Sequence, residues 1–202
     1  MKSAYLPGIP PWLSYGVLCF LSVYATLSYT GGETVGVLAW LAAGFALAGV
    51  MLHGYWVVPG ILVGALLAFQ ANNLSITNSA VYALGAVAGA SVAGSMLRHQ
   101  GPSHQLMQSS EQLVKFLLTA SLVAPLFPVL SSLAVLYLDG SATRDSLLQA
   151  SGSVWLSHTV GIILITPLVL AWRTRSGTGF HWHRFEALLL GIATLALCLL
   201  LQ

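Results

Sequence analysis

Charged residues are scarce in this sequence. Its 202 residues include only seven Lys and Arg and five Asp and Glu, whereas a soluble domain of this length carries about fifty charged side chains. A surface exposed to water cannot be built from so few charges, and the mean hydropathy of +0.85 agrees. The sequence therefore predicts an integral membrane protein and leaves no room for a soluble catalytic domain.

Cysteine and the common catalytic motifs are scarce or absent as well. Cys19 and Cys198 lie within apolar runs, which argues against a disulfide framework or a cysteine-based metal site. The sequence lacks GxSxG, HExxH, Walker and GxGxxG patterns, so nothing in it supports an enzyme. A net charge of only +2 gives no sign of a nucleic-acid partner. We therefore expect no catalytic residue and no metal site in this chain.

What the sequence has instead is long apolar runs. The runs are long enough for helical membrane spans, and none alternates with the period of a transmembrane strand, which predicts an all-α, polytopic helical membrane bundle of about seven spans. The expected spans cover residues 12–29, 35–52, 57–69, 79–97, 113–138, 153–172 and 185–201. Pro125 and Pro128 predict that the fifth is either one kinked span or two half-spans. Residues 141–151 predict a short surface helix before the sixth span.

The basic residues predict the orientation of the bundle. Lys2, the connection 98–115 and the loop 173–184 fall on one side of a seven-span arrangement, whereas Glu33 and the connection 139–145 fall on the other. Because basic loops stay in the cytoplasm, we expect a cytoplasmic N-terminus. Seven spans then place the C-terminus outside, and the last span ends without a charged flank. We therefore expect a fragment of a longer protein that contains an eighth span.

His158 is the ionisable residue that lies deepest in an expected span, five residues into the sixth. Intramembrane ionisable groups are costly and often functional, so His158 is a candidate ligand contact, proton-linked switch or axial haem ligand. The simpler alternative is a neutral histidine that donates a hydrogen bond to a neighbouring carbonyl. His53 is a second candidate cofactor ligand, but it comes roughly 27 Å after the outer start of its span, against roughly 8 Å for His158. The two should lie on opposite faces of the bilayer and not share one haem.

Two further patterns each have two explanations. Asn72 and Asn73 end the third span, and they either line an outward-facing pocket or form an ordinary polar loop. Small residues recur four positions apart at 60–64 and at 85–89. This spacing allows two helix backbones to approach closely, either within the bundle or in a dimer formed through the fourth span.

Four segments of the chain have the order of features of a known bacterial family. They are the small-residue run at 41–48, the turn GYWVVPGILVGA at 54–65 followed by Asn72 or Asn73, the Arg98-His99 pair, and WLSHTVG at 155–161 with TPL at 166–168. In these segments the sequence resembles the membrane-associated sensor domains of the first type, the MASE family. His158 stands where many members have Asp, which favours a histidine-specific ligand or cofactor in this chain.

The resemblance implies that residues 1–202 form a single membrane-embedded sensor domain of the bacterial inner membrane. Such domains precede histidine kinase, diguanylate cyclase or cyclic-di-GMP phosphodiesterase domains, so we expect a cytoplasmic output domain beyond residue 202 and a homodimer formed through it. The signal would be a small molecule or a membrane protein, as for members similar to the sensor kinase for hexose phosphate. We expect the signal site between spans two, three and six, with His158, Trp155, Asn72 and Asn73 as its polar contacts.

Two other functions are compatible with the sequence. A haem- or metal-binding redox or gas-sensing module would use His158 or His53, with haem as the candidate cofactor. A small-molecule transport component would bind its cargo within the bundle and need no further domain. Haem absorbance would indicate the first of these, and a stop codon directly after residue 202 would count against the sensor.

Overall fold

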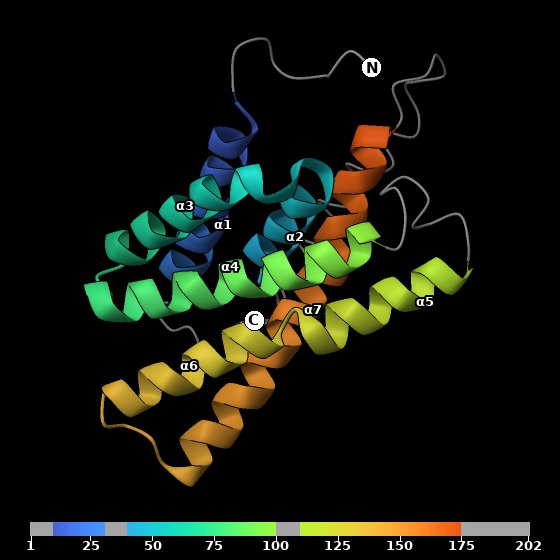
Figure 1. The fold of residues 1–202 in the computed structure, drawn as a ribbon. Helices are drawn as coiled ribbons and strands as arrows, with labels where there is room; N and C mark the ends of the chain where they lie inside the picture. Colours follow the sequence, from blue (N-terminus) through green and yellow to red (C-terminus); the bar gives the residue numbers. More distant parts are fainter. Residues whose placement is uncertain (1–9, 31–39, 100–109, 175–202) are drawn as a thin grey trace.

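The computed structural model describes residues 10–30, 40–99 and 110–174. Within these ranges the chain is helical and contains no strand, which confirms the all-α class (Figure 1). The expected span at 185–201 lies outside the described residues, as do Lys2, Glu33 and most of the loop 173–184.

The helical elements make up a polytopic membrane domain. In chain order they are α1 Pro11–Tyr29, α2 Leu41–His53, η1 Gly54–Val57, α3 Val58–Ala71, α4 Ile76–His99, α5 Ser110–Leu118, η3 Thr119–Val123, α6 Leu126–Leu138 and α7 Arg144–Thr174. In the described ranges, five helical segments are long and apolar enough to cross a membrane, at 11–29, 41–71, 76–99, 110–138 and 144–171. The expected number of seven spans is therefore not confirmed.

Glycine brings α1 and α3 into backbone contact. Trp12 of α1 lies against Gly60 of α3, and Gly16 lies against Gly64. A Cβ atom on Gly60 or Gly64 would come closer than 3.0 Å to a carbonyl oxygen of α1, a distance that Cβ atoms essentially never show. Because the contacts advance in the same direction along both helices, α1 and α3 run parallel. The small residues at 60–64 thus serve packing within the bundle.

The second helix runs opposite to both of these. Tyr15 of α1 contacts Gly49 of α2, whereas Cys19, one turn later, approaches the carbonyl oxygen of Ala42. Since α1 is antiparallel to α2 and parallel to α3, the segment 41–71 folds back on itself at η1 (Figure 1). Each arm is only about 20 Å long, shorter than a hydrocarbon core of about 30 Å. The two arms occupy the places of the expected second and third spans.

A sharp turn at Gly54 joins α2 to α3. Gly54 has φ +72° and ψ −156°, a backbone region that is essentially restricted to glycine. Arg98 of α4 lies beside this turn, and its Nη1 donates a hydrogen bond to the carbonyl oxygen of Val50 at 3.3 Å. A positive charge near the last carbonyl groups of a helix stabilises that end. Gly54 and Arg98, far apart in the sequence, therefore form one structural unit.

We expect Gly54→Ala to lower the free energy of unfolding by about 1–3 kcal/mol, because alanine is strained in this backbone region. Its Cβ would also overlap the Arg98 guanidinium. The matched control is Gly140→Asn, since Gly140 has φ +68° but nothing within 4 Å of an added Cβ, and asparagine tolerates the left-handed region. Unfolding of the detergent-solubilised protein by SDS measures both variants. A Gly54→Ala protein as stable as the parent would contradict this role of the turn.

The fourth helix packs antiparallel to α6 through its own small residues. Gly85 contacts the side chain of Ser131, whereas Gly89, one turn later, contacts the carbonyl oxygen of Ala124 and the ring of Pro128. The small residues at 85–89 are therefore occupied inside one chain, and this assigns them to packing within the bundle.

The two prolines of the fifth expected span bend one helical segment. Elements α5, η3 and α6 follow one another without reversing direction across residues 110–138 (Figure 1), in agreement with a kinked span. Before Pro125, the N–H of Ala124 donates to the carbonyl oxygen of Thr119 at 3.0 Å, which is the five-residue spacing of a π-turn. Such turns are a common cause of a sharp helix bend.

The last described helix is longer than its sequence suggested. α7 runs without interruption over 31 residues, Arg144–Thr174, so the prediction of a separate surface helix at 141–151 is wrong. Gly152 falls inside the helix in open space, with nothing within 4 Å of an added Cβ. The helix therefore continues through the Ser151-Gly152-Ser153 sequence. As a result, His158 lies about 21 Å from the start of its helix, near the middle.

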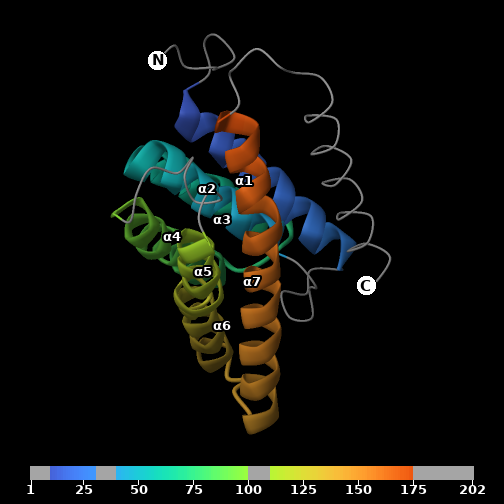
Figure 2. The same ribbon diagram turned by 90° about the vertical axis from the view of Figure 1, so that its right-hand side faces the viewer.

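This long helix lies parallel to α2 and touches it closely. The N–H of Trp40, the residue before α2, donates to the carbonyl oxygen of Ser157 at 2.8 Å. Further along, Thr166 Oγ1 donates to the carbonyl oxygen of Gly44 at 3.1 Å. A Cβ on Gly44 would lie 2.5 Å from the carbonyl oxygen of Gly161. Figure 2 shows α7 extending along the whole described bundle beside the other helices.

Candidate functional site

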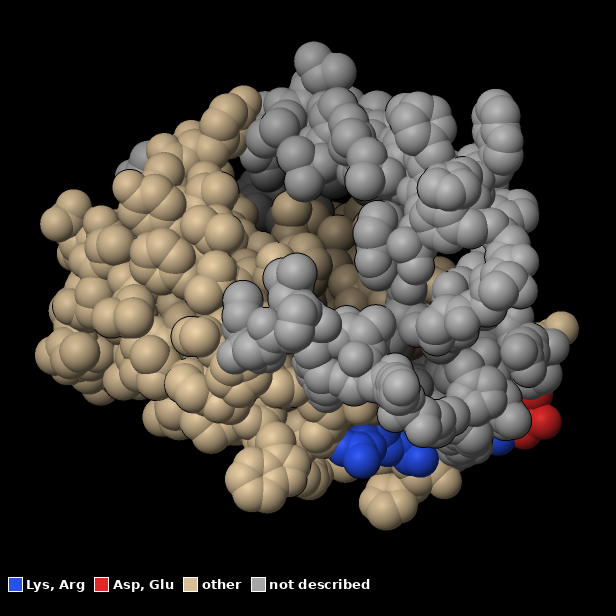
Figure 3. All heavy atoms as spheres, turned by 90° about the horizontal axis from the view of Figure 1, so that it is seen from above, with Lys and Arg blue, Asp and Glu red and all other residues tan. Residues whose placement is uncertain are grey.

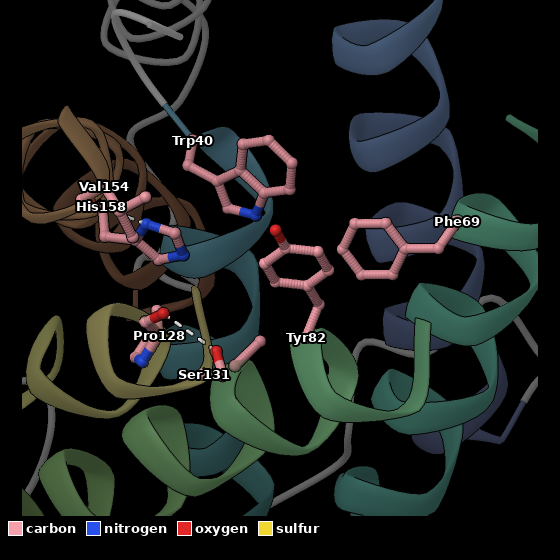
Figure 4. Close-up of a pocket in the computed structure, with 8 residues that line it drawn as sticks. Trp40, Phe69, Tyr82, Pro128, Ser131, Val154 and His158 are labelled. Carbon is pink, nitrogen blue, oxygen red and sulfur yellow. Dashed lines mark hydrogen bonds between the residues drawn. The ribbon is translucent and has the colours of Figure 1, made fainter. Parts of the chain in front are cut away.

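A small cavity lies where the described helices α3, α4, α6 and α7 meet the start of α2 (Figure 4). Its volume is about 30 Å³, and its lining residues are Trp40, Phe69, Tyr82, Ala86, Pro128, Ser131, Val154 and His158. One water molecule needs about 10–15 Å³ on this scale, whereas sites for drug-sized ligands measure about 300–1,000 Å³. The cavity therefore has room for one or two small polar groups.

His158 supplies the cavity with a hydrogen-bond acceptor. Its side chain is only 8% exposed, and Nδ1 lies 2.9 Å from the carbonyl oxygen of Val154, one turn earlier in α7. Because a carbonyl only accepts, Nδ1 must carry the proton, and Nε2 of the neutral ring is left as an acceptor. Figure 4 shows Nε2 directed toward the space between Trp40 and Tyr82. The expected hydrogen bond to a neighbouring carbonyl is present, and it leaves the second nitrogen for the cavity.

Trp40 faces His158 from the start of α2, and the sequence did not single it out. The two rings are stacked with centroids 5.7 Å apart, and Trp40 also stacks on Phe69 at 6.3 Å. The indole is 6% exposed, and its N–H points into the cavity (Figure 4). A buried tryptophan usually needs a partner for this donor. This requirement was the only feature of the sequence that could have indicated a role for Trp40. The apolar run around it otherwise predicted only a membrane span.

Tyr82 and Ser131 complete the polar wall of the cavity and were also missed. The hydroxyl of Tyr82 points toward Trp40 and His158 from α4 (Figure 4). Ser131 Oγ donates to the carbonyl oxygen of Pro128 at 2.8 Å and still has acceptor capacity. Both residues belong to expected spans, where a single tyrosine or serine is too common to indicate a site.

The structure does not bring the other predicted contacts to this cavity. Trp155 follows Val154 in α7 but is not among the lining residues. Asn72 and Asn73 lie at the end of α3, where Asn72 Nδ2 donates to the carbonyl oxygen of Ala68 at 2.9 Å and Asn73 has φ +63°. Both features are typical of residues that terminate a helix. Of the four predicted ligand contacts, the structure thus places only His158 in the cavity.

His53 lies at the other end of α2 from His158. Trp40, which stacks on His158, precedes α2, whereas His53 ends it and packs against the ring of Tyr15 at 5.4 Å. Thirteen helical residues separate Trp40 from His53 by about 20 Å, so one haem iron cannot bind both histidines. The described residues also contain no group of three or more His, Cys, Asp or Glu that could hold a metal ion.

Charged side chains are kept away from the cavity. None of its lining residues is Asp, Glu, Lys or Arg. At the end of the bundle seen in Figure 3, charged side chains of the described chain gather at one edge, and the remaining described surface in that view is uncharged. Among the described charged residues, Lys115 and Glu111 form an exposed ion pair. The walls that the described residues form are therefore neutral, polar and aromatic.

The comparison with protein families decides the identity of the chain. A model of the MASE1 family matches residues 11–202. The chain belongs to the MASE1 family. MASE1 is a membrane-associated sensor domain, which is consistent with a sensory input role for this chain. No curated protein and no solved structure matches the chain.

The segments that carried the resemblance to the MASE1 family lie in contact in this structure. The turn at Gly54 contacts Arg98 of the Arg-His pair. The segment 155–168 packs against the small-residue run 41–48 through Gly161 and Gly44. The MASE1 pattern thus marks helix contacts, and it reaches the cavity only through His158.

Proposed function

We propose that this MASE1 domain senses a signal in the His158 cavity and transmits it as a movement of α7 along α2. The observation that carries the proposal is that two residues belong both to the cavity and to a helix contact. Trp40 and His158 line the cavity, and they also stack on each other across the contact between α2 and α7. A ligand that changes their packing would therefore act directly on that helix contact.

The rest of α7 is suited to carry such a movement. It remains helical from Arg144 to Thr174. Beyond His158 it contacts α2 through the approach of Gly161 and the Ile165 side chain to Gly44 and through one side-chain hydrogen bond, from Thr166 to Gly44. Packed helices can slide past one another by small amounts, as in shear motions. A signal then shifts the population between two packings by binding one of them more tightly.

The output of this movement would be a cytoplasmic domain beyond residue 202. Membership of the MASE1 family supports a histidine kinase, a diguanylate cyclase or a cyclic-di-GMP phosphodiesterase in that place, with a homodimer formed through it. We propose that the N-terminus lies in the cytoplasm of a bacterial inner membrane. Arg98 and Lys115 support this orientation, because they flank the connection between α4 and α5 and basic residues are enriched in cytoplasmic connections. The size of the cavity favours a small molecule over a membrane protein as the signal.

Two substitutions of His158 test the proposal in the full-length protein. Asparagine retains a donor near the position of Nδ1 and loses Nε2, whereas glutamine places an amide near the position of Nε2. We expect His158→Asn to change the basal output activity in membranes by about three- to tenfold, the equivalent of one hydrogen bond. We expect His158→Gln to restore part of the parent output.

The control for these variants is Leu156→Ala. Leu156 lies in the same helix with 57% of its surface exposed, so its truncation should leave the output within twofold of the parent. The opposite pattern, with parent-like output for His158→Asn and a change only for His158→Gln, would show that His158 serves only to hold Val154. That result would contradict the proposed site.

A further inference from the structure

We infer that the His158 cavity binds a small, neutral molecule whose hydroxyl or amide group both donates and accepts a hydrogen bond. This inference rests on the proposed function, because it names the class of signal for the same cavity. It follows from three properties of the described residues around it, which are their hydrogen-bonding groups, their lack of charge and the volume that they enclose.

Two polar atoms of buried side chains face the cavity and define the hydrogen bonds that a ligand must make. His158 Nε2 is an acceptor, since Nδ1 donates to Val154, and Trp40 Nε1 is a donor. Within the part of the chain that the structure describes, neither atom has a hydrogen-bond partner, and both residues are more than nine-tenths buried. Both atoms point into the same space (Figure 4). A purely apolar occupant would leave both unpaired, and this is costly away from water.

The described residues around the cavity carry no charge, which favours a neutral ligand over an ion. The lining residues include no Asp, Glu, Lys or Arg, and the walls of Trp40, Phe69 and Tyr82 are aromatic. An ion in this place would lose its hydration without gaining a counter-charge. A neutral hydroxyl or amide loses far less on entering, because Nε2 and Nε1 replace its bonds to water.

The volume limits the size of the ligand. About 30 Å³ accommodates a molecule of a few heavy atoms or one or two waters. Formamide meets every requirement, since its N–H groups can donate to His158 Nε2 and its carbonyl can accept from Trp40 Nε1. Formate has the same shape but carries a negative charge and lacks the donor, so it is the matched counterpart.

The experiment is a titration of the chain in lipid nanodiscs, with ¹⁵N-labelled histidine and tryptophan observed by NMR. We expect formamide and methanol to shift the His158 Nε2 and Trp40 Nε1 resonances together and with saturation, whereas formate leaves both unchanged. His158→Asn, which loses Nε2, and Trp40→Phe, which loses the indole N–H, should each weaken formamide binding by about three- to tenfold.

Two results would overturn the inference. If neither neutral solute gives a saturable shift, the cavity holds resident water only. If formate shifts the resonances as formamide does, the site does not select for neutral molecules. In either case the output of the His158 variants is a separate measurement. If His158→Asn still changes the output, only the inference about a small, neutral ligand is overturned. The proposed function of the cavity then remains.

Discussion

Replacing Gly60 by alanine should prevent α1 and α3 from packing as they do in this structure. The added Cβ would overlap the carbonyl oxygen of Trp12, and neither partner can move aside because both belong to helix backbone. Overpacking of a well-packed contact costs about 1–3 kcal/mol and sometimes more. For Gly60→Ala we expect a cost at or above the upper end of this range, because the overlapping atom belongs to the backbone. We expect loss of at least about 3 kcal/mol of unfolding free energy, or a protein that does not fold in membranes.

A control for this result comes from the outer side of the same helix. Val63 lies in α3 with 53% of its surface exposed, so Val63→Ala should change the stability by less than about 0.5 kcal/mol. SDS unfolding and size-exclusion chromatography in detergent compare the two variants with the parent. If Gly60→Ala is as stable as Val63→Ala, the backbone contact between α1 and α3 is not formed in the protein.

The second large effect is expected at Gly161, where α7 meets the start of α2. A Cβ at this position would overlap the carbonyl oxygen of Trp40, so Gly161→Ala must push α7 away from α2 and from the cavity. We expect an unfolding free energy lower by about 2–3 kcal/mol and, in the full-length protein, a change of basal output larger than that of His158→Asn. Gly152→Ala is the matched control, because the same substitution in the same helix meets nothing within 4 Å.

A milder variant keeps this prediction testable if Gly161→Ala does not fold. Thr166→Val preserves the shape of a fully buried side chain and removes its hydrogen bond to the carbonyl oxygen of Gly44. The lost bond is worth about 1 kcal/mol, and output should change by a few fold. Parent-like output from a folded Gly161→Ala protein, or from Thr166→Val, would mean that the α2–α7 contact does not transmit the signal.

Much of the fold could be predicted from the sequence because the relevant rules are local. The lengths of the apolar runs indicated the helices, and the lack of alternation excluded strands. The prediction failed at residues 141–151, where a separate surface helix was expected, although the helix continues through Gly152 as part of α7. The sequence did indicate one short arm, because the expected span 57–69 is shorter than a usual span.

The candidate site was predicted only at His158. An ionisable residue inside a span is rare, so its position alone made it a candidate. Trp40 and Tyr82 are aromatic residues in apolar runs, and such residues usually fill a core or face lipid. The choice between these roles depends on how each helix is rotated against its neighbours, which no local pattern records. Asn72 and Asn73 were predicted from their polarity to contact a ligand. In the structure they terminate α3 instead.

The sequence by itself determined that this protein is a helical membrane domain. Too few charges were available for a water-exposed surface, and backbone groups in lipid must be paired within each segment, which helices achieve without distant partners. Only the tertiary structure decided which polar groups meet. The backbone contacts at Gly44, Gly60 and Gly161 set the spacing and rotation of the helices. The spacing and the rotation depend on pairs of residues far apart in the chain. Together they bring Trp40, at the start of α2, against His158 of α7.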